Sequence, residues 1–246
     1  MYKVSHNSDH RATPVHSPGT VRGGELQSIR RLIPDSVLFL ASAVGDFSDC
    51  LSAQERKLVE KAVPRRRNEF ATGRMLAASA LLELGEPVAP ILQGSMNEPI
   101  WPAGVLGSIT HTVDTCMVAV TRNPDVTALG IDLEVRPADF DDLERLILNG
   151  RELAGKLPDG FPARDRVRLL FSAKESIYKG AYPTVQRFVD FEEVCIEIDF
   201  ERSGFTASAP DDDELDALVS SGKGRFRMTD EFVFTIWYAT RHGESG

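Results

Sequence analysis

The stretch that most constrains this chain is Leu129-Gly-Ile-Asp-Leu-Glu134, in which apolar and acidic residues alternate. Alternation with a period of two is typical of a β-strand, whose successive side chains point to opposite faces. Asp132 and Glu134 therefore share one face, while Ile131 and Leu133 enter a core. Because neighbouring carboxylates repel one another, two interpretations stay open: a solvated strand face, or a carboxylate pair that holds a cation.

A second stretch, Phe171-Ser-Ala-Lys-Glu-Ser-Ile-Tyr-Lys179, has the amphipathic pattern of a helix. Glu175 and Lys179 are four residues apart and so are neighbours on one helix face, and Lys174 adds a second cation. A surface ion pair would explain the spacing equally simply. If this helix faces the acidic strand, the two together suit Mg²⁺ and a polyphosphate, because the lysines neutralise phosphate charge that the metal leaves.

A third group of residues is basic. Arg67 and Arg74 are seven residues apart in a helical pattern, which places them on one face, and Arg66 flanks that face. Planar guanidinium groups match phosphate oxygens, although a solvated basic helix face is the alternative. His111 lies where one predicted strand ends before the next begins, and a lone histidine of this kind is either structural or functional.

Helices and strands are expected in two rounds, at about 35–125 and 126–240. Ser52 and Glu55 form the pattern of a capping box, which predicts a helix over 53–63 that Pro64 ends. Other helices are expected at about 65–82, 139–148 and 162–179, the last closed by Gly180, with a turn or short helix from 211. Strands are expected at 37–41, 107–111, 116–121, 129–134, 194–200, 204–209, 224–228 and 232–239.

Composition excludes several classes of protein. With 37 acidic residues against 28 Lys and Arg, a formal net charge of -9 argues against a general nucleic-acid binder. No apolar run is long enough for a membrane span, and the N-terminus lacks the apolar core of a secretory signal. Of the three widely spaced cysteines, Cys116 and Cys195 lie in strand-like patterns and fit reduced, buried residues of a cytoplasmic protein, and no Cys/His spacing suggests zinc.

The chain is expected to divide into three parts. Residues 1–24 are rich in Ser, His, Pro, Gly and Thr and predict a disordered tail, in which His6, His10 and His16 are flexible surface groups or a metal-binding tag. Residues 25–125 form the N-terminal half, and residues 126–246 form the C-terminal half with the metal and catalytic motifs.

Five short motifs follow one another along the chain: Arg66-Arg-Asn-Glu-Phe70 with Arg74, Pro99-Ile-Trp-Pro102, Gly107-Ser-Ile-Thr-His111, Gly130-Ile-Asp-Leu-Glu134 and Phe171–Lys179. In this order and spacing they resemble the 4′-phosphopantetheinyl transferase superfamily, in its single-chain type and its enterobactin-synthetase and actinobacterial branch. The similarity covers about residues 35–240, and the last two motifs together are specific.

The resemblance implies an α+β (α/β sandwich) fold of two similar α/β halves about a pseudo-twofold axis, with coenzyme A in the cleft between them. It implies that a monomeric, Mg²⁺-dependent enzyme (Mn²⁺ is the alternative) transfers phosphopantetheine from coenzyme A to a serine of an acyl or peptidyl carrier protein. Asp132, Glu134 and Glu175 match metal ligands, and Glu175 also matches the base. The remaining matches are Lys174 and Lys179 for phosphate binding, Arg66, Arg67, Arg74 and His111 for coenzyme A, and Asp132, Glu175 and His111 for the catalytic set.

Two departures and two rival functions remain. Phe171 stands where many relatives have Trp, and Gln93 and Met96 stand where close relatives carry lysines, which puts in doubt a cationic contact from that loop. A metal-dependent phosphohydrolase acting on coenzyme A would use the same acidic cluster. A non-catalytic coenzyme A-binding module would bind without turnover.

Overall fold

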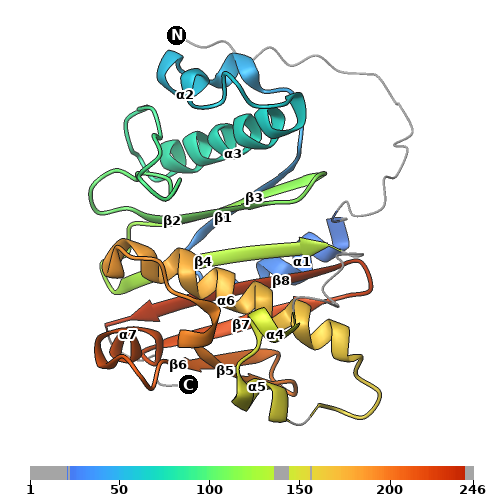
Figure 1. Ribbon diagram of the computed structural model, residues 1–246. Coiled ribbons are helices and arrows are strands. Elements are labelled where there is room, and N and C mark those ends of the chain that lie inside the picture. Colours follow the sequence, from blue (N-terminus) through green and yellow to red (C-terminus); the bar gives the residue numbers. More distant parts are fainter. Residues whose placement is uncertain (1–20, 22, 136–143, 156, 242–246) are drawn as a thin grey trace.

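The chain folds into an α+β structure in which each half packs one long helix on an antiparallel sheet. The computed structural model describes residues 21, 23–135, 144–155 and 157–241. In Figure 1, helix α3 lies above the sheet of the first half, and helix α6 crosses the larger sheet of the second half below it. The predicted α+β fold class is confirmed.

The N-terminal sheet has three antiparallel strands in the order β1–β3–β2. These strands are β1 (Leu38–Ala43), β2 (Leu106–His111) and β3 (Thr115–Thr121). The helices of this half are α1 (Gly23–Arg30), η1 (Ser48–Cys50), α2 (Ala53–Leu58) and α3 (Pro64–Glu83). Helix α3 begins at Pro64 because proline in the first helical position loses no helical hydrogen bond.

The C-terminal sheet has five antiparallel strands in the order β4–β8–β7–β6–β5. Its strands are β4 (Val126–Val135), β5 (Cys195–Asp199), β6 (Gly204–Ser208), β7 (Gly222–Met228) and β8 (Phe232–Thr240). Its helices are α4 (Glu144–Ile147), α5 (Gly150–Ala154), α6 (Ala163–Val185), η2 (Phe191–Glu193) and α7 (Asp213–Val219).

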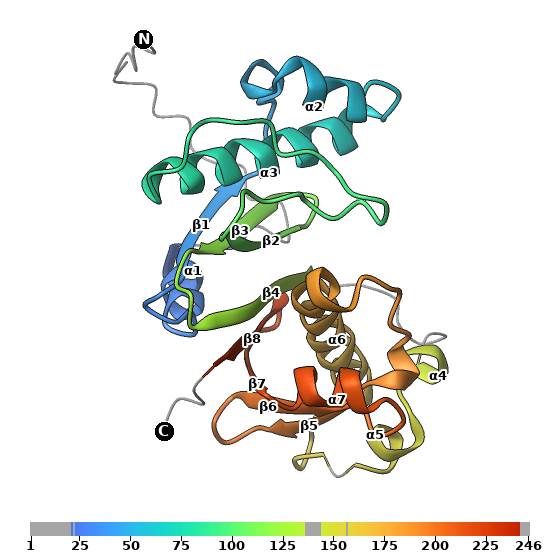
Figure 2. The same ribbon diagram turned by 90° about the vertical axis from the view of Figure 1, so that its left-hand side faces the viewer.

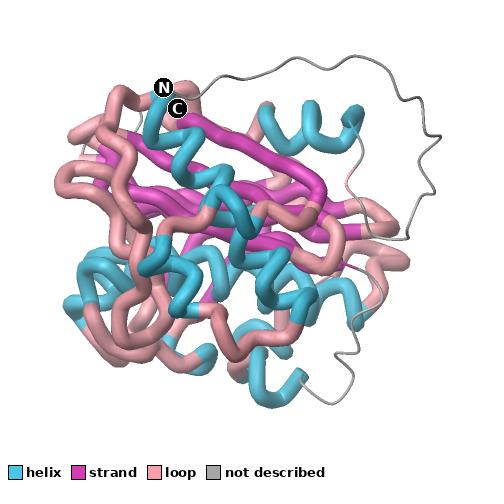
Figure 3. Tube along the Cα trace, turned by 90° about the horizontal axis from the view of Figure 1, so that it is seen from above, coloured by secondary structure: helices cyan, strands magenta, loops and turns pink. Residues whose placement is uncertain are grey.

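Apolar side chains of the two sheets pack against each other and form a core between the halves. Met117 of β3, Ile131 and Leu133 of β4, and Phe234 of β8 belong to this core, which Ile29 of α1 also joins. Figure 2 shows the resulting order of layers, with α3, the first sheet and the second sheet following one another and α6 beside the second sheet. Seen from above, helices cross over the strands (Figure 3). The alternation of residues 129–134 therefore directs Ile131 and Leu133 into the core, as predicted.

Several local signals are borne out, and others need correction. The capping box forms, since Ser52 Oγ accepts the Glu55 N–H at 3.2 Å and Glu55 Oε2 accepts the Ser52 N–H at 2.9 Å. The helix that it starts ends at Leu58 and not at Val63, because the backbone leaves helical geometry at Val59. Residues 1–20 and 22 of the predicted tail lie outside the described residues, but its last two residues, 23 and 24, are helical. Of the helix predicted at 139–148, residues 139–143 also lie outside the described part.

The sequence predicted that Gly180 ends a helix, but this prediction is wrong because α6 continues to Val185. Its function is instead close packing. A Cβ atom on Gly180 would lie 3.0 Å from the backbone nitrogen of Gly130, and a Cβ on Gly130 would meet the Ser176 carbonyl oxygen. The two glycines thus allow α6 to lie directly against β4, which brings Lys179 next to Asp132.

Replacing Gly130 by Ala is therefore expected to destabilise the protein by about 3 kcal/mol or more, because neither backbone can yield to the added methyl group. Gly150→Ala is the matched control, since no atom lies within 4 Å of a Cβ built there. Urea unfolding of both variants measures the difference. Equal stabilities would show that the close approach of α6 and β4 is relaxed in solution.

Candidate active site

On the acidic face of β4, Asp132 is buried and Glu134 is half-buried, which rules out a fully solvated strand face. Asp132 is only 3% exposed and lies against α6. Its Oδ1 atom accepts a hydrogen bond from Lys179 Nζ at 2.6 Å and another from Thr110 Oγ1 at 3.3 Å. Its Oδ2 atom is buried and has no hydrogen-bond partner in the described part of the chain. A buried carboxylate oxygen without a partner is costly unless a ligand completes it.

Glu134 and Glu175 lie in the same electrostatic environment. Burial raises the pKa of Glu134 to about 8, and repulsion from Asp132 and Glu175 adds to the effect while Lys179 opposes it. Burial also raises the pKa of Glu175, which Lys179 lowers and Asp132 raises. Three carboxylates therefore share Lys179, and the excess of negative charge is what a divalent cation would offset.

This pKa predicts a pH-dependent stability that the Glu134→Gln variant should lack. Because burial raises the folded-state pKa of Glu134 from 4.5 to about 8, its protonation favours the folded protein, and wild type loses stability as the pH rises through that interval. In the presence of a chelator the variant should be more stable than wild type at pH 8 by about 1–3 kcal/mol, since one pKa unit corresponds to about 1.4 kcal/mol. Near pH 4.5 the gain should vanish. Urea unfolding at both pH values tests this, and a gain of equal size at both would contradict it.

Two hydroxyl groups that were not among the site residues expected from the sequence join the halves next to these carboxylates. Strand β4 is at the edge of its sheet, and there Ser108 Oγ accepts the Ile131 N–H and Thr110 Oγ1 accepts the Leu133 N–H, both at 3.1 Å. Ser108 and Thr110 alternate on β2, so a period-two reading of residues 107–111 contained the signal. Each hydroxyl oxygen thus accepts an N–H of β4 that a backbone carbonyl of an adjacent strand would otherwise have accepted.

The basic residues of the first half meet His111 at the same junction. Arg66 NH1 lies 2.6 Å from His111 Nε2, and His111 Nδ1 lies 3.7 Å from Glu69 Oε2. Burial lowers the pKa of His111, with Glu69 acting against that shift and Arg66 and Lys179 adding to it. A neutral ring then accepts the Arg66 N–H at Nε2 and carries its proton on Nδ1. The buried Glu69, which also pairs with Arg65 Nε at 3.1 Å, organises this cluster and was missed as a site residue.

Arg74 and Arg67 do not behave alike, although both were assigned to one basic face. Arg74 is 6% exposed, its guanidinium lies 4.5 Å from the centre of the Phe70 ring, and its Nε has no hydrogen-bond partner among the described residues. Burial lowers its pKa to about 10, and nearby Arg66 contributes to the shift. Arg67 is exposed instead. The structure thus associates Arg74 with Arg66 and with the interior, where a guanidinium suits an anion.

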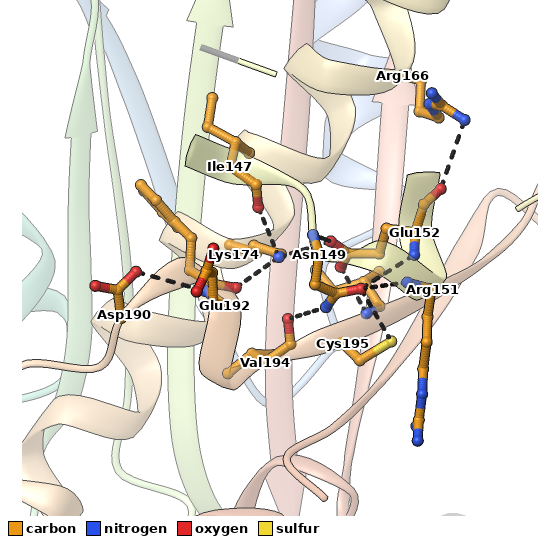
Figure 4. A network of polar contacts seen from close by, with 12 residues as sticks. Ile147, Asn149, Arg151, Glu152, Arg166, Lys174, Asp190, Glu192, Val194 and Cys195 are labelled. Atoms are coloured by element: carbon orange, nitrogen blue, oxygen red, sulfur yellow. Dashed lines mark hydrogen bonds and ion pairs between the residues drawn. The ribbon is translucent and has the colours of Figure 1, made fainter. Parts of the chain in front are cut away.

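Lys174 needs a correction, because the structure does not place it with the carboxylates of β4. Its side chain is 2% exposed, and its ammonium group donates to Glu152 Oε2 at 2.7 Å and to the carbonyl oxygens of Ile147 and Phe191 at 2.8 and 2.6 Å. Figure 4 shows this network around Lys174. An ammonium group has three donors, all of which are used here, so Lys174 stabilises the C-terminal half and does not fit a direct phosphate contact.

Glu175 and Lys179 line a cavity of about 220 Å³ together with Trp101, Tyr178 and Met96. A cavity of about 460 Å³ adjoins it and shares Trp101 but contains none of the three carboxylates. In the loop that borders both cavities, Gln93 pairs with Pro99 in an isolated β-bridge and Met96 is about half exposed. Residues 86–106 contain no Lys or Arg, so this loop contributes no cation to the site.

The donor set fits a hard divalent cation in kind. Carboxylate oxygens from Asp132, Glu134 and Glu175 are the ligands that Mg²⁺ prefers. Asp132 Oδ2, which has no partner within the described ranges, can accept such an ion. As the side chains stand in the described ranges, no group of three or more His, Cys, Asp and Glu residues is arranged to hold a metal. For all three carboxylates to bind one ion, at least one of these side chains must turn. Among the helices described here, none is both long enough and apolar enough to cross a membrane.

Two family models and several known proteins match this chain. Residues 54–121 match the 4′-phosphopantetheinyl transferase N-terminal domain, and residues 128–236 match the 4′-phosphopantetheinyl transferase superfamily. The 4′-phosphopantetheinyl transferase Svp of Streptomyces mobaraensis is 40% identical over 67% of this chain and 68% of its own length. The 4′-phosphopantetheinyl transferase PptT of Mycobacterium tuberculosis is 34% identical over 74% and 83%. Enterobactin synthase component D of Escherichia coli K12 is 34% identical over 52% and 61%. The chain therefore belongs to the 4′-phosphopantetheinyl transferase superfamily.

Proposed function

We propose that this member of the superfamily transfers the 4′-phosphopantetheine group of coenzyme A to a serine of an apo acyl or peptidyl carrier protein, with release of 3′,5′-ADP. The observation that supports it most directly is the convergence of two oppositely charged groups at one junction. Three carboxylates and Lys179 come from the second half, and Arg66 and His111 come from the first. A substrate with a diphosphate and a separate 3′-phosphate needs both groups.

In this proposal Asp132, Glu134 and Glu175 hold Mg²⁺, with Mn²⁺ as the alternative. When bound, the metal neutralises charge on the phosphate oxygens and favours the alkoxide form of the attacking serine. Lys179 adds a positive charge to the diphosphate, while Arg66, Arg74 and His111 bind the 3′-phosphate and orient the nucleotide. Lys174 is left out of this set because Glu152 and two carbonyl oxygens use its donors. Arg67 is exposed, as Arg66 is, and stays a candidate contact for coenzyme A.

The reaction is an in-line substitution at the β-phosphorus of coenzyme A. The serine oxygen forms a bond to phosphorus, and the bond from phosphorus to the oxygen that bridges the α-phosphate breaks, so 3′,5′-ADP leaves with the electron pair. Glu175 accepts the serine proton. A positioned carboxylate is a common general base in proton transfer from a hydroxyl group.

The proposal also covers the location of the protein, its oligomeric state and its docking to carrier proteins. We place the protein in the cytoplasm as a monomer, with no nucleic-acid or membrane partner. Carrier domains are typically acidic, and this chain also carries a net charge of -9, so docking cannot depend on whole-surface attraction. Docking should instead use a local apolar patch with a few basic residues.

One experiment separates this function from its rivals. A panel of apo carrier proteins is incubated with the enzyme and coenzyme A, with and without Mg²⁺, and mass spectrometry records a gain of about 340 Da, one phosphopantetheine. Metal-dependent modification of at least one carrier supports the transferase. Hydrolysis of coenzyme A without any carrier would favour a phosphohydrolase, and binding of coenzyme A without either reaction would favour a non-catalytic module.

The assignment of Arg74 can be tested with dephospho-coenzyme A, which lacks the 3′-phosphate. Wild type should bind it roughly 10- to 100-fold more weakly than coenzyme A, the loss expected for hydrogen bonds to a charged group. Arg74→Ala should discriminate far less between the two ligands, because the variant lacks the guanidinium group that would contact the 3′-phosphate. Arg31→Ala, which removes an exposed arginine distant in sequence from the motifs, is the control. Calorimetry that shows the same discrimination in Arg74→Ala and wild type would exclude Arg74 from the site.

A further inference from the structure

The two oxygens of Asp132 have different environments. Oδ1 accepts hydrogen bonds from both Lys179 Nζ and Thr110 Oγ1, at 2.6 and 3.3 Å. Oδ2 is buried and has no partner among the described residues. A carboxylate held through one oxygen has a fixed orientation, and its second oxygen then points in a fixed direction.

Thr110 is well suited to hold the first oxygen. Its side chain is 3% exposed, and its hydroxyl group both donates to Asp132 Oδ1 and accepts the Leu133 N–H at 3.1 Å. One hydroxyl therefore grips the carboxylate and the backbone of the residue next to it. A hydroxyl group has one donor hydrogen and two acceptor lone pairs. Because Thr110 accepts the Leu133 N–H with a lone pair, its donor hydrogen is still available for Asp132.

We propose that Thr110 is a positioning residue that, together with Lys179, locks the Asp132 carboxylate so that Oδ2 is presented to a divalent cation. The inference rests on the metal site of the proposed function and adds a residue to it from the other half of the molecule. Hydrogen bonds that orient metal-binding carboxylates commonly contribute 10- to 100-fold to metal affinity.

The location of Thr110 adds a second consequence. It lies one residue before His111 on β2, and His111 contacts Arg66 on α3. A single edge strand thus carries the group that fixes the metal-binding carboxylate and a group assigned to the nucleotide. Any shift of β2 on nucleotide binding would act on Asp132 directly through Thr110.

Ser108 provides a matched control within the same strand. Its hydroxyl accepts the Ile131 N–H at 3.1 Å, the same distance as the bond of Thr110 to Leu133, and it is equally buried. Ile131 has an apolar side chain in the core, so this bridge joins the halves without contacting a carboxylate. Loss of either bridge should weaken the junction between the sheets, but only loss of the Thr110 hydroxyl should disturb the metal site.

The test measures Mn²⁺ binding to the full chain by electron paramagnetic resonance, without coenzyme A or carrier, alongside thermal unfolding. Thr110→Val, which keeps the shape of the side chain but removes the hydroxyl, should bind Mn²⁺ about 10- to 100-fold more weakly. Thr110→Ser should bind within about threefold of wild type because the hydroxyl is retained, and Ser108→Ala should do the same because it leaves Asp132 untouched. Should Thr110→Val fail to fold, Thr110→Ala replaces it.

Two outcomes would overturn the inference: equal Mn²⁺ affinity in Thr110→Val and Ser108→Ala, or failure of Thr110→Ser to restore binding. Both would leave Thr110 as a purely structural bridge. Because the measurement needs neither coenzyme A nor carrier, its result is independent of transfer. A wild-type protein that binds Mn²⁺ with this dependence on Thr110 but modifies no carrier would contradict the proposed function and support the inference.

Discussion

Replacing Asp132 by Asn is expected to lower the rate of phosphopantetheine transfer by at least about three orders of magnitude, because a metal site contributes several kcal/mol of charge stabilisation to the transition state. Asn keeps one oxygen for Lys179 and Thr110, which now contact Oδ1, but it cannot offer a second carboxylate oxygen to a cation. Single-turnover transfer to an apo carrier at saturating Mg²⁺ measures the loss.

Asn is a better substitution than Ala at this position. Lys179 forms a 2.6 Å ion pair with Asp132, so removing the whole side chain would leave a half-buried ammonium group without its nearest partner. Glu197→Gln, which neutralises an exposed carboxylate on the outermost strand β5, is the control and should keep its rate. If Asp132→Asn retained near-normal rates in Mg²⁺ while folded, Asp132 would not be a metal ligand.

Glu175→Gln should retain coenzyme A binding and lose turnover by roughly two to four orders of magnitude, the range for a lost general base. Gln preserves the size of the side chain that lines the cavity beside Lys179, but its amide cannot accept the serine proton. Calorimetric binding of coenzyme A with Mg²⁺, compared with single-turnover transfer, separates the two effects.

The result for Glu175→Gln distinguishes three functions of this residue. Loss of rate with binding intact identifies the base. Loss of both identifies chiefly a metal ligand and moves the base elsewhere. An unchanged rate would mean that Glu175 serves only as a charge partner of Lys179, whose pKa Asp132 and Glu175 together raise.

Elements whose signals are local could be predicted from the sequence. The capping box at Ser52 depends on residues three positions apart and forms as expected. The strand at 129–134 depends on alternation alone, and it places Asp132 and Glu134 on one face of β4. These features follow from backbone geometry that repeats every two to four residues, so they need no knowledge of the rest of the chain.

Lys174 and Gly180 show where local signals fail. The motif around Glu175 gives no indication of which lysine reaches the carboxylates of β4. In the structure Lys179 pairs with Asp132, whereas Lys174 pairs with Glu152. Glu152, which pairs with Lys174, lies 22 residues away in the chain. Gly180 resembled a helix end because glycine commonly ends helices, whereas its actual neighbour is Gly130 of another element.

The sequence by itself determined the strand with two carboxylates, the helix with Glu175 and Lys179, and the basic start of α3, because each depends on the spacing of nearby side chains. Only the tertiary structure decided which of these side chains meet. It brought Thr110 and Ser108 to the edge of β4, buried Lys174 against Glu152, and left Asp132 Oδ2 without a hydrogen-bond partner among the described residues. The physical reason is that burial and hydrogen bonding between distant segments depend on how sheets and helices pack, and no periodicity within one segment records that packing.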